Sequence, residues 1–238
     1  MIFIIFIDHQ MRYQKLKTKS WKFFTLFIIF FCVFQAKAQQ ATRFLELGSS
    51  LNSYRGDLNP SYSKTGASLQ IGFKQNFKKR LNGHFQLGIG SFSGNNPRYQ
   101  FDDESGNTTT PNLFFKTNFV SLQYDFQYHV LKNKHWQIYL SQGLGMMRFT
   151  PKDEANQSLV NQLISRKTDE SYTQVTLILP TQIGITYLFD NQYGINLQTG
   201  WLNLQSDYVD NISQWGNRKK KDNLWQLKVA FVIPVSFQ

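Results

Sequence analysis

Apolar and polar residues alternate with a period of two in eight segments of this 238-residue chain, all beyond residue 42. The alternation is strongest over 173–189, where for example Ile183, Ile185 and Tyr187 are separated by a glycine and a threonine. The eight segments are 43–54, 66–77, 84–93, 114–131, 135–149, 173–189, 192–205 and 223–237. This period indicates β-strands whose two faces have different surroundings, and no segment has a convincing helical period. The chain is therefore predicted to be all-β.

The connections between these segments alternate in length. Residues 78–83, 132–134 and 190–191 are tight turns, whereas 55–65, 94–113, 150–172 and 206–222 are long and polar. With an even number of strands, an up-and-down order places every short turn and both chain ends on one side and every long loop on the other. The segments also have the roughly 9–11 residues that a tilted strand needs to cross a bilayer. This asymmetry predicts an eight-stranded antiparallel up-and-down transmembrane β-barrel.

The N-terminal region has the order of a secretory signal peptide. A basic stretch precedes the apolar run 23–34, and the small-x-small sequence Ala-Lys-Ala, ending at Ala38, follows it. This run is shorter than the roughly 20 apolar residues of a membrane-spanning helix, so cleavage near Ala38 is predicted rather than an anchor. A complete signal peptide begins at Met11, which is the predicted start. The predicted organisation is a signal peptide over 1–38 and one barrel domain over 39–238.

Charge and cysteine content exclude two classes of function. The leader carries six of the 26 Lys and Arg residues and one of the 15 Asp and Glu residues, which leaves 20 and 14 in the mature chain, a net charge of +6. Much of the overall +11 therefore belongs to targeting, and no nucleic-acid partner is expected. The single cysteine, Cys32, lies in the leader, so the mature chain has no thiol or disulfide chemistry.

Three features predict which face of the strands points inward, a question that alternation alone leaves open because a soluble lipocalin-like barrel alternates too. Glycines fall on the polar face, and glycine weakens a strand unless space is scarce, as inside an eight-stranded barrel. That face carries Gln rather than the Lys and Glu of a water-exposed surface. The apolar face ends near the short turns in aromatic rings, which are typical of the bilayer interface. The predicted periplasmic girdle is Phe77, Phe85, Phe126, Tyr128, Trp136, Tyr187, Phe189, Tyr193 and Phe237.

The inward face also carries titratable side chains. The predicted lumen charges are Glu46, Lys74, Asp125 and Lys228. They are expected to pair with one another, because a lone charge in a narrow interior is costly. The histidines of this face, all beside short turns, are His84, His129 and His135. Three imidazoles can bind a metal such as zinc, but a hydrogen-bonded polar plug is the commoner use of such residues in a barrel. No metal, cofactor or catalytic residue is assigned.

The stretch LELGSSLNSYRGDLNP, Leu45 to Pro60, resembles the opening of small outer-membrane β-barrel proteins of the Bacteroidetes type. The matching residues are Glu46, Gly48, Tyr54, Gly56, Asp57, Asn59 and Pro60. In architecture the chain is similar to OmpA/OmpX-type barrels, whose last strand usually ends in an aromatic residue that the assembly machinery reads; here Phe237 is followed by Gln238. The resemblance implies a Gram-negative outer-membrane location and contact with outer-membrane lipids, lipopolysaccharide and the barrel-assembly machinery.

The leading functional hypothesis is a non-enzymatic outer-membrane protein with an envelope-structural role or with extracellular or envelope partners for its long loops. A diffusion pore is not expected, because eight strands leave an interior that side chains fill. The alternative is a lipid-modifying enzyme, which needs a nucleophile or base near the outer leaflet. A soluble periplasmic ligand-binding barrel is a third possibility. The basic run Asn217 to Asp222 is either a solvated loop or a contact for lipopolysaccharide phosphates.

Overall fold

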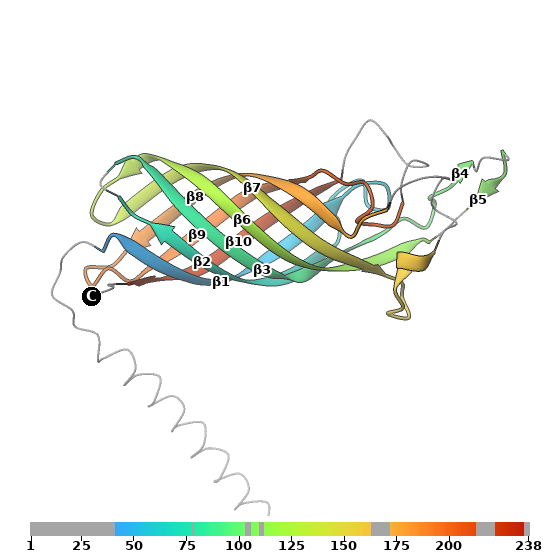
Figure 1. Cartoon of the computed structure of the whole chain (residues 1–238), viewed down its shortest axis with the longest axis horizontal. Helices are drawn as coiled ribbons and strands as arrows, with labels where there is room; N and C mark the ends of the chain where they lie inside the picture. Colours follow the sequence, from blue (N-terminus) through green and yellow to red (C-terminus); the bar gives the residue numbers. More distant parts are fainter. Residues whose placement is uncertain are drawn as a thin grey trace, which may run out of the picture. The chain divides into compact units, whose positions relative to one another are not determined.

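Eight antiparallel strands close into a barrel in a computed structural model of the chain, which describes residues 41–77, 79–102, 106–109, 112–162, 172–212 and 222–235 (Figure 1). The barrel strands are β1 (Arg43–Arg55), β2 (Thr65–Gln75), β3 (Leu81–Asn95), β6 (Phe114–Lys132), β7 (Trp136–Lys152), β8 (Val175–Leu188), β9 (Gly194–Leu204) and β10 (Asn223–Pro234). The predicted signal peptide lies outside the described residues. In the described ranges, no helix is long and apolar enough to cross a membrane.

The strands follow one another around the barrel in chain order, and β1 pairs with β10 to close it. The closing register joins Glu46 to Val232 and Asn52 to Gln226. Closure removes both sheet edges, so every strand has a hydrogen-bonding neighbour on each side. The predicted eight-stranded antiparallel up-and-down barrel is therefore confirmed.

The two ends of the barrel differ in their connections, as predicted. The turn end carries the short connections 76–80, 133–135 and 189–193, and the loop end carries the long ones, 56–64, 96–113, 153–174 and 205–222. Two loops contain short elements that the sequence analysis did not predict: the hairpin of β4 (Phe101–Asp102) and β5 (Thr108–Thr109), and the 3-10 turn η1 (Leu159–Asn161).

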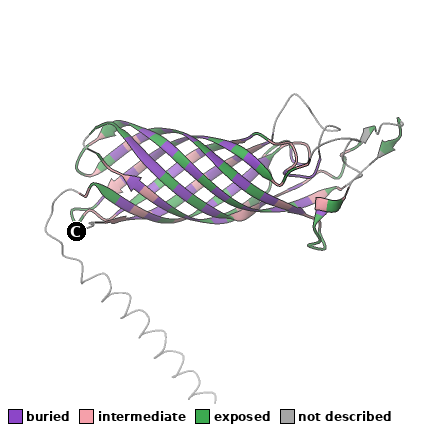
Figure 2. Ribbon diagram, viewed as in Figure 1, coloured by how far each residue is buried: buried purple, intermediate pink, exposed green. Residues whose placement is uncertain are grey.

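Burial alternates residue by residue along the strands, which appears as regular stripes in Figure 2. The alternate residues that are buried include the glycines. Because glycine has no side chain, it makes room for large neighbours. A Cβ atom built at Gly72, Gly143 or Gly184 would collide with His84, Asp125 or Tyr139 respectively. The glycine-bearing face is thus the crowded inside of the barrel, as predicted.

Proline interrupts the wall at one place. The β7–β8 ladder contains Gln142↔Thr181 and Gly145↔Ile178, but the two pairs between them, one of which would include Pro180, are absent. Proline has no N–H to donate, so it breaks a ladder on one side while leaving the other intact. On that other side Pro180 still pairs with Leu202 of β9. Pro234 is the last residue of β10 and disturbs nothing further along that strand.

Candidate functional site

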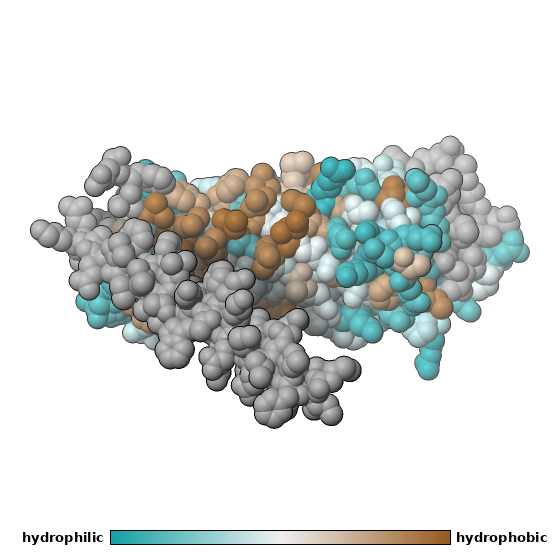
Figure 3. Space-filling model, turned by 90° about the horizontal axis from the view of Figure 1, so that it is seen from below, coloured by the Kyte–Doolittle hydropathy of each residue, from teal (hydrophilic) through white to brown (hydrophobic). Residues whose placement is uncertain are grey.

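The outer surface of the barrel wall divides into an apolar and a polar part. Figure 3 shows hydrophobic residues gathered over the wall toward the turn end and hydrophilic ones over the wall toward the loop end. Large apolar side chains are widely exposed in the first part, up to 66% for Leu69 and 60% for Ile89. The others include Leu47, Leu51, Ile71, Leu87, Val120, Leu122, Leu144, Met146, Leu177, Leu179, Ile183, Ile195, Leu197 and Val229. We call this surface the apolar belt. Soluble monomers rarely expose so large a contiguous apolar surface.

Aromatic side chains edge the apolar belt near the turn end. The predicted girdle residues described as exposed are Phe77, Phe85, Phe126, Tyr128, Trp136 and Phe189; Tyr187 and Tyr193 are half-buried. Their rings also contact one another, with centroids 4.6 Å apart for Trp136 and Tyr187 and 5.5 Å apart for Tyr187 and Phe189. Phe237 lies outside the described residues.

The interior of the turn-end half is mostly polar, apart from a small apolar cluster of Phe44, Leu188 and Val232, and it contains a buried ion pair. The ammonium of Lys228 lies 3.2 Å from Oε2 of Glu46 and donates to Oε1 of Gln86 at 2.7 Å. Asn196 also donates to Glu46, at 3.2 Å. Glu46, Lys228 and Asn196 come from β1, β10 and β9, so this network ties together the strands at the closing seam. These contacts offset the free-energy cost of burying the charges of Glu46 and Lys228 in a narrow interior.

The other two predicted lumen charges have different partners. Lys74, expected to pair with a carboxylate, instead lies over the ring of Tyr139 at 4.4 Å and 3.5 Å from Thr186 Oγ1. Asp125 accepts from Gln123 at 3.0 Å, and its second neighbour is the ring of His84 at 3.5 Å. The Tyr139 ring thus attracts the ammonium group of Lys74, because the face of an aromatic ring is electrostatically negative.

The three histidines have separate partners. His84 is fully buried between Glu46 and Asp125, with each carboxylate 3.5 Å from a ring nitrogen. His129 meets the Asn82 amide at 2.8 Å, and His135 meets the Leu188 carbonyl at 3.0 Å. In the described part of the chain, no three His, Cys, Asp or Glu residues are arranged to hold a metal ion. All three histidines lie in the turn-end half of the barrel.

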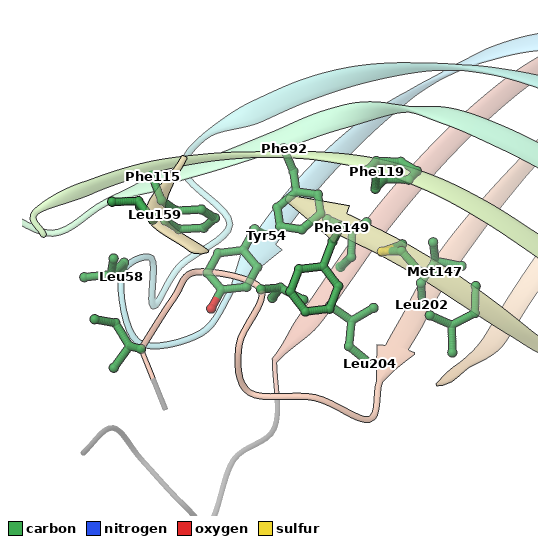
Figure 4. Close-up of a cluster of buried hydrophobic side chains, with 14 residues drawn as sticks. Tyr54, Leu58, Phe92, Phe115, Phe119, Met147, Phe149, Leu159, Leu202 and Leu204 are labelled. Atoms are coloured by element: carbon green, nitrogen blue, oxygen red, sulfur yellow. The ribbon is translucent and has the colours of Figure 1, made fainter. Parts of the chain in front are cut away.

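The interior of the loop-end half is apolar, which the sequence analysis did not anticipate. In the sequence analysis the inward face is described as polar and rich in glutamine, and no separate apolar region is named. Figure 4 shows a packed cluster there instead, and its buried members are Tyr54, Leu58, Phe92, Phe115, Phe119, Met147, Phe149, Leu159, Ile178, Leu202, Leu204, Val209, Ile212 and Leu224. Tyr54 packs edge to face on Phe115, with ring centroids 4.9 Å apart, and stacks on Phe92 with centroids 5.6 Å apart. We call this the loop-end core.

Three long loops fold over the loop-end core and close it. Leu58 enters from the β1–β2 loop, Leu159 from η1, and Val209 and Ile212 from the β9–β10 loop. The last of these loops is fastened by Thr117, whose hydroxyl donates to the Val209 carbonyl at 2.5 Å. The described parts of these loops therefore form a cap with its own hydrophobic core, rather than solvated connections.

A buried acidic pair lies in this cap. The Tyr54 hydroxyl is 2.8 Å from Oδ2 of Asp210 and 2.5 Å from Oδ1 of Asp222, and backbone N–H groups of Leu58 and Ile212 donate to Asp210. One hydroxyl hydrogen cannot serve two carboxylates, so one of these contacts requires a protonated carboxyl group that donates to the phenol oxygen. Burial, reinforced by neighbouring carboxylates, raises the pKa of both Asp210 and Asp222 well above the usual value for aspartate. Asp222 belongs to the basic run Asn217 to Asp222, which was predicted to be either a solvated loop or a contact for lipopolysaccharide phosphates; Asp222 itself is buried, and residues 217–221 lie outside the described residues.

Together these features define a closed eight-stranded barrel with an apolar belt outside and a filled interior. Among solved structures, the chain is similar to Neisserial surface protein A (NspA), with a TM-score of 0.51 and 11% identity over 82% of this chain and 98% of that one. It is also similar to Ail of Yersinia pestis, with a TM-score of 0.48 and 9% identity over 82% of this chain and 99% of that one. A third similar structure is the outer membrane enzyme PagL, with a TM-score of 0.40 and 10% identity over 80% of this chain and 99% of that one.

These similarities concern the fold alone, because the identities are low. No protein-family model and no curated protein matches the sequence. The resemblance of Leu45 to Pro60 to Bacteroidetes-type barrels therefore stays a prediction.

Proposed function

We propose that this protein is a non-enzymatic integral protein of the Gram-negative outer membrane, that it does not conduct solutes, and that it acts through its capped loop end. The observation that carries the proposal is that the outer surface of the barrel wall changes from apolar at one end to polar at the other. Toward the turn end the wall exposes large apolar side chains, and toward the loop end it exposes polar ones. A closed barrel with an apolar belt satisfies all its backbone groups internally, as hydrocarbon requires.

The filled interior argues against a diffusion pore. Mostly polar side chains, with the small apolar cluster of Phe44, Leu188 and Val232, occupy the turn-end half, and the loop-end core with its cap occupies the other. Barrels that pass solutes have many more strands and a water-filled lumen. We expect no stable conductance steps when the purified protein is added to a planar lipid bilayer. Regular ion-conducting steps would refute this part of the proposal.

The role proposed for the loop end is to stabilise the envelope or to bind an extracellular or envelope partner. The cap supports this because its core holds loop residues in fixed positions outside the apolar belt, and a preorganised surface binds with a smaller entropic penalty. Its lipid neighbours in this proposal are outer-membrane lipids and lipopolysaccharide, and the barrel-assembly machinery inserts it.

Cysteine labelling tests location and orientation together, because the only native cysteine is Cys32, in the predicted leader. Ser158 is exposed at the loop end, and Asn133 is exposed in a turn at the opposite end. An impermeant maleimide added to whole cells should label Ser158→Cys and leave Asn133→Cys unmodified until the outer membrane is permeabilised. Labelling of Asn133→Cys alone would reverse the orientation, and recovery of the protein in the soluble periplasmic fraction would overturn the membrane location.

A further inference from the structure

The outer face of β6 and β7 changes chemistry stepwise toward the loop end. Successive outward cross-strand pairs are Leu122↔Met146, Val120↔Arg148, Asn118↔Thr150 and Lys116↔Lys152. The first pair belongs to the apolar belt, the next joins an apolar residue to a cation, the third is polar, and the last consists of two lysines. The side chains of Lys116 and Arg148 are exposed and that of Lys152 is half-buried.

The two lysines face each other directly. Residues opposite one another in an antiparallel pair have Cβ atoms about 4.5–5.5 Å apart, and like charges at that spacing are destabilising. Two other described lysines do pair with carboxylates, Lys228 with Glu46 and Lys134 with Asp190. No described carboxylate forms an ion pair with Lys116, Arg148 or Lys152.

The next carboxylates along the chain do not neutralise this cluster. Asp153 follows Lys152, but its Oδ1 accepts from the backbone N–H of Gln157 at 2.7 Å within its own loop. Glu154 is exposed and forms no ion pair with a described residue. Among the described residues, three cations thus lie on one stretch of wall without a carboxylate partner, and their charge is open to an external anion.

We propose that Lys116, Lys152 and Arg148 bind the phosphate groups of a phosphorylated lipid, of which lipid A is the example used below. The inference rests on the proposed function, because it requires the apolar belt to lie in a bilayer. The geometry matches an amphipathic ligand: acyl chains would lie on Leu122 and Met146, and phosphates would lie above them among the three cations. Arg148, at the edge of the belt, also offers the forked donor geometry that suits phosphate.

The test uses the full chain, purified from membranes and reconstituted in phosphatidylcholine vesicles. Lipid A with both phosphates should raise the midpoint of thermal unfolding, whereas the same lipid A without phosphates should not. In Lys116→Gln/Lys152→Gln, binding of phosphorylated lipid A should weaken by about 5-fold for each lysine removed. The matched control, Lys79→Gln/Arg80→Gln, removes two exposed positive charges at the turn end and should bind like the wild type.

A charge reversal should change the thermal stability of the protein in opposite directions in vesicles without and with phosphorylated lipid A. Lys116→Glu places a carboxylate opposite Lys152, so it should stabilise the protein in vesicles without lipid A. The same variant should lose the stabilisation that phosphorylated lipid A provides. If Lys116 had only a structural role and bound no lipid, its replacement would shift the unfolding midpoint in the same direction with and without phosphorylated lipid A.

Several outcomes would overturn the inference. They are equal stabilisation by dephosphorylated lipid A, equal weakening in the turn-end control, or an effect of inorganic phosphate alone as large as that of the lipid. A protein that inserts into the vesicles yet shows no preference for phosphorylated lipid A would refute the site and leave the proposed function standing. Failure of the wild type to enter vesicles at all would refute the proposed function itself.

Discussion

The two halves of the barrel use the same alternation with opposite chemistry. In the turn-end half, leucines such as Leu197 point outward and glutamines such as Gln198 point inward. In the loop-end half, Thr65 and Lys116 point outward while Phe92 and Phe115 point inward. This difference shows that the chemistry of the inward and outward residues depends on what surrounds each half of the barrel. Where the outside is hydrocarbon, polar groups collect inside, and where the outside is water, the ordinary hydrophobic effect fills the inside with aromatic rings.

The largest effect is expected from emptying the loop-end core. Phe92 is fully buried against Tyr54 and Phe115, with centroids 5.6 and 6.2 Å away. Phe92→Ala should lower the free energy of unfolding in lipid vesicles by about 3–5 kcal/mol, because it leaves a cavity. Leu87→Ala, on the outward face of the same strand, should change it much less, since lipid fills the space. Equal losses in denaturant titrations would show that the loop end has no separate core.

A charge on the apolar belt should have the next largest effect. Leu197→Arg is expected to lower the free energy of unfolding in vesicles by about 2–4 kcal/mol, the usual penalty for arginine near the bilayer midplane. Thr65→Arg, on the outward face at the loop end, should lower it by roughly 0–1 kcal/mol, since the site lies in water or at the interface. If the two variants lost stability equally, the outward face would have one solvent along its whole length.

Removal of one hydroxyl group should loosen the cap. Tyr54→Phe leaves the buried oxygens of Asp210 and Asp222 without the phenol, and buried polar groups that lose their partner typically destabilise a protein by about 1–3 kcal/mol. The first readout is hydrogen exchange of backbone amides in residues 206–212. Unchanged exchange there, with slower or faster exchange elsewhere, would contradict a local role for Tyr54.

Asp210 and Asp222 should also make the stability of the cap depend on pH. Because the pKa values of Asp210 and Asp222 are raised in the folded state, their stabilising contribution is fully present below the unfolded pKa, about 4, and is lost as pH rises through the folded values. The cap amides should therefore be more strongly protected, relative to their intrinsic exchange rate at each pH, in mildly acidic than in neutral buffer. Asp222→Asn removes one titrating group and should flatten this dependence; a steeper dependence in that variant would be inconsistent with the geometry.

The smallest effect is expected for a polar replacement in the turn-end interior. Gln198 donates to Gln182 at 2.6 Å, and Gln198→Ser removes this bond. The expected loss in unfolding free energy is about 0.5–1.5 kcal/mol, the usual net value of one hydrogen bond. Neighbouring polar groups can supply new partners to the serine. A loss as large as that of Leu197→Arg would mean that the interior is packed as strictly as the loop-end core.

Local pattern alone was sufficient to predict the strands and their order. Alternation located all eight strands, with most ends placed to within a few residues, and loop lengths predicted the turn end and the loop end. Glycine placement predicted the inward face, because Gly72, Gly143 and Gly184 mark places where a large neighbour needs the space. The ion pair of Glu46 with Lys228 also follows from two charges of inward parity on strands that close the barrel.

The cap and the partners of the remaining lumen groups could not be predicted in this way. Which loop covers the mouth depends on distant contacts, such as Thr117 with the Val209 carbonyl, that no local pattern records. Likewise, Lys74 meets the ring of Tyr139 rather than a carboxylate because the tilt of the strands sets which inward side chains share a level of the interior.

The sequence by itself determined the all-β class, the number of strands, the face of each strand that points inward and the two unlike ends, because alternation, glycine placement and loop length are local properties. Only the tertiary structure decided where polar interior gives way to apolar core, that Asp210 and Asp222 share one hydroxyl, and that Lys116 faces Lys152. These features depend on the register between strands and on loops folding back over the barrel. Register and loop packing bring together residues far apart in the chain, so their chemistry exists only after the barrel has closed.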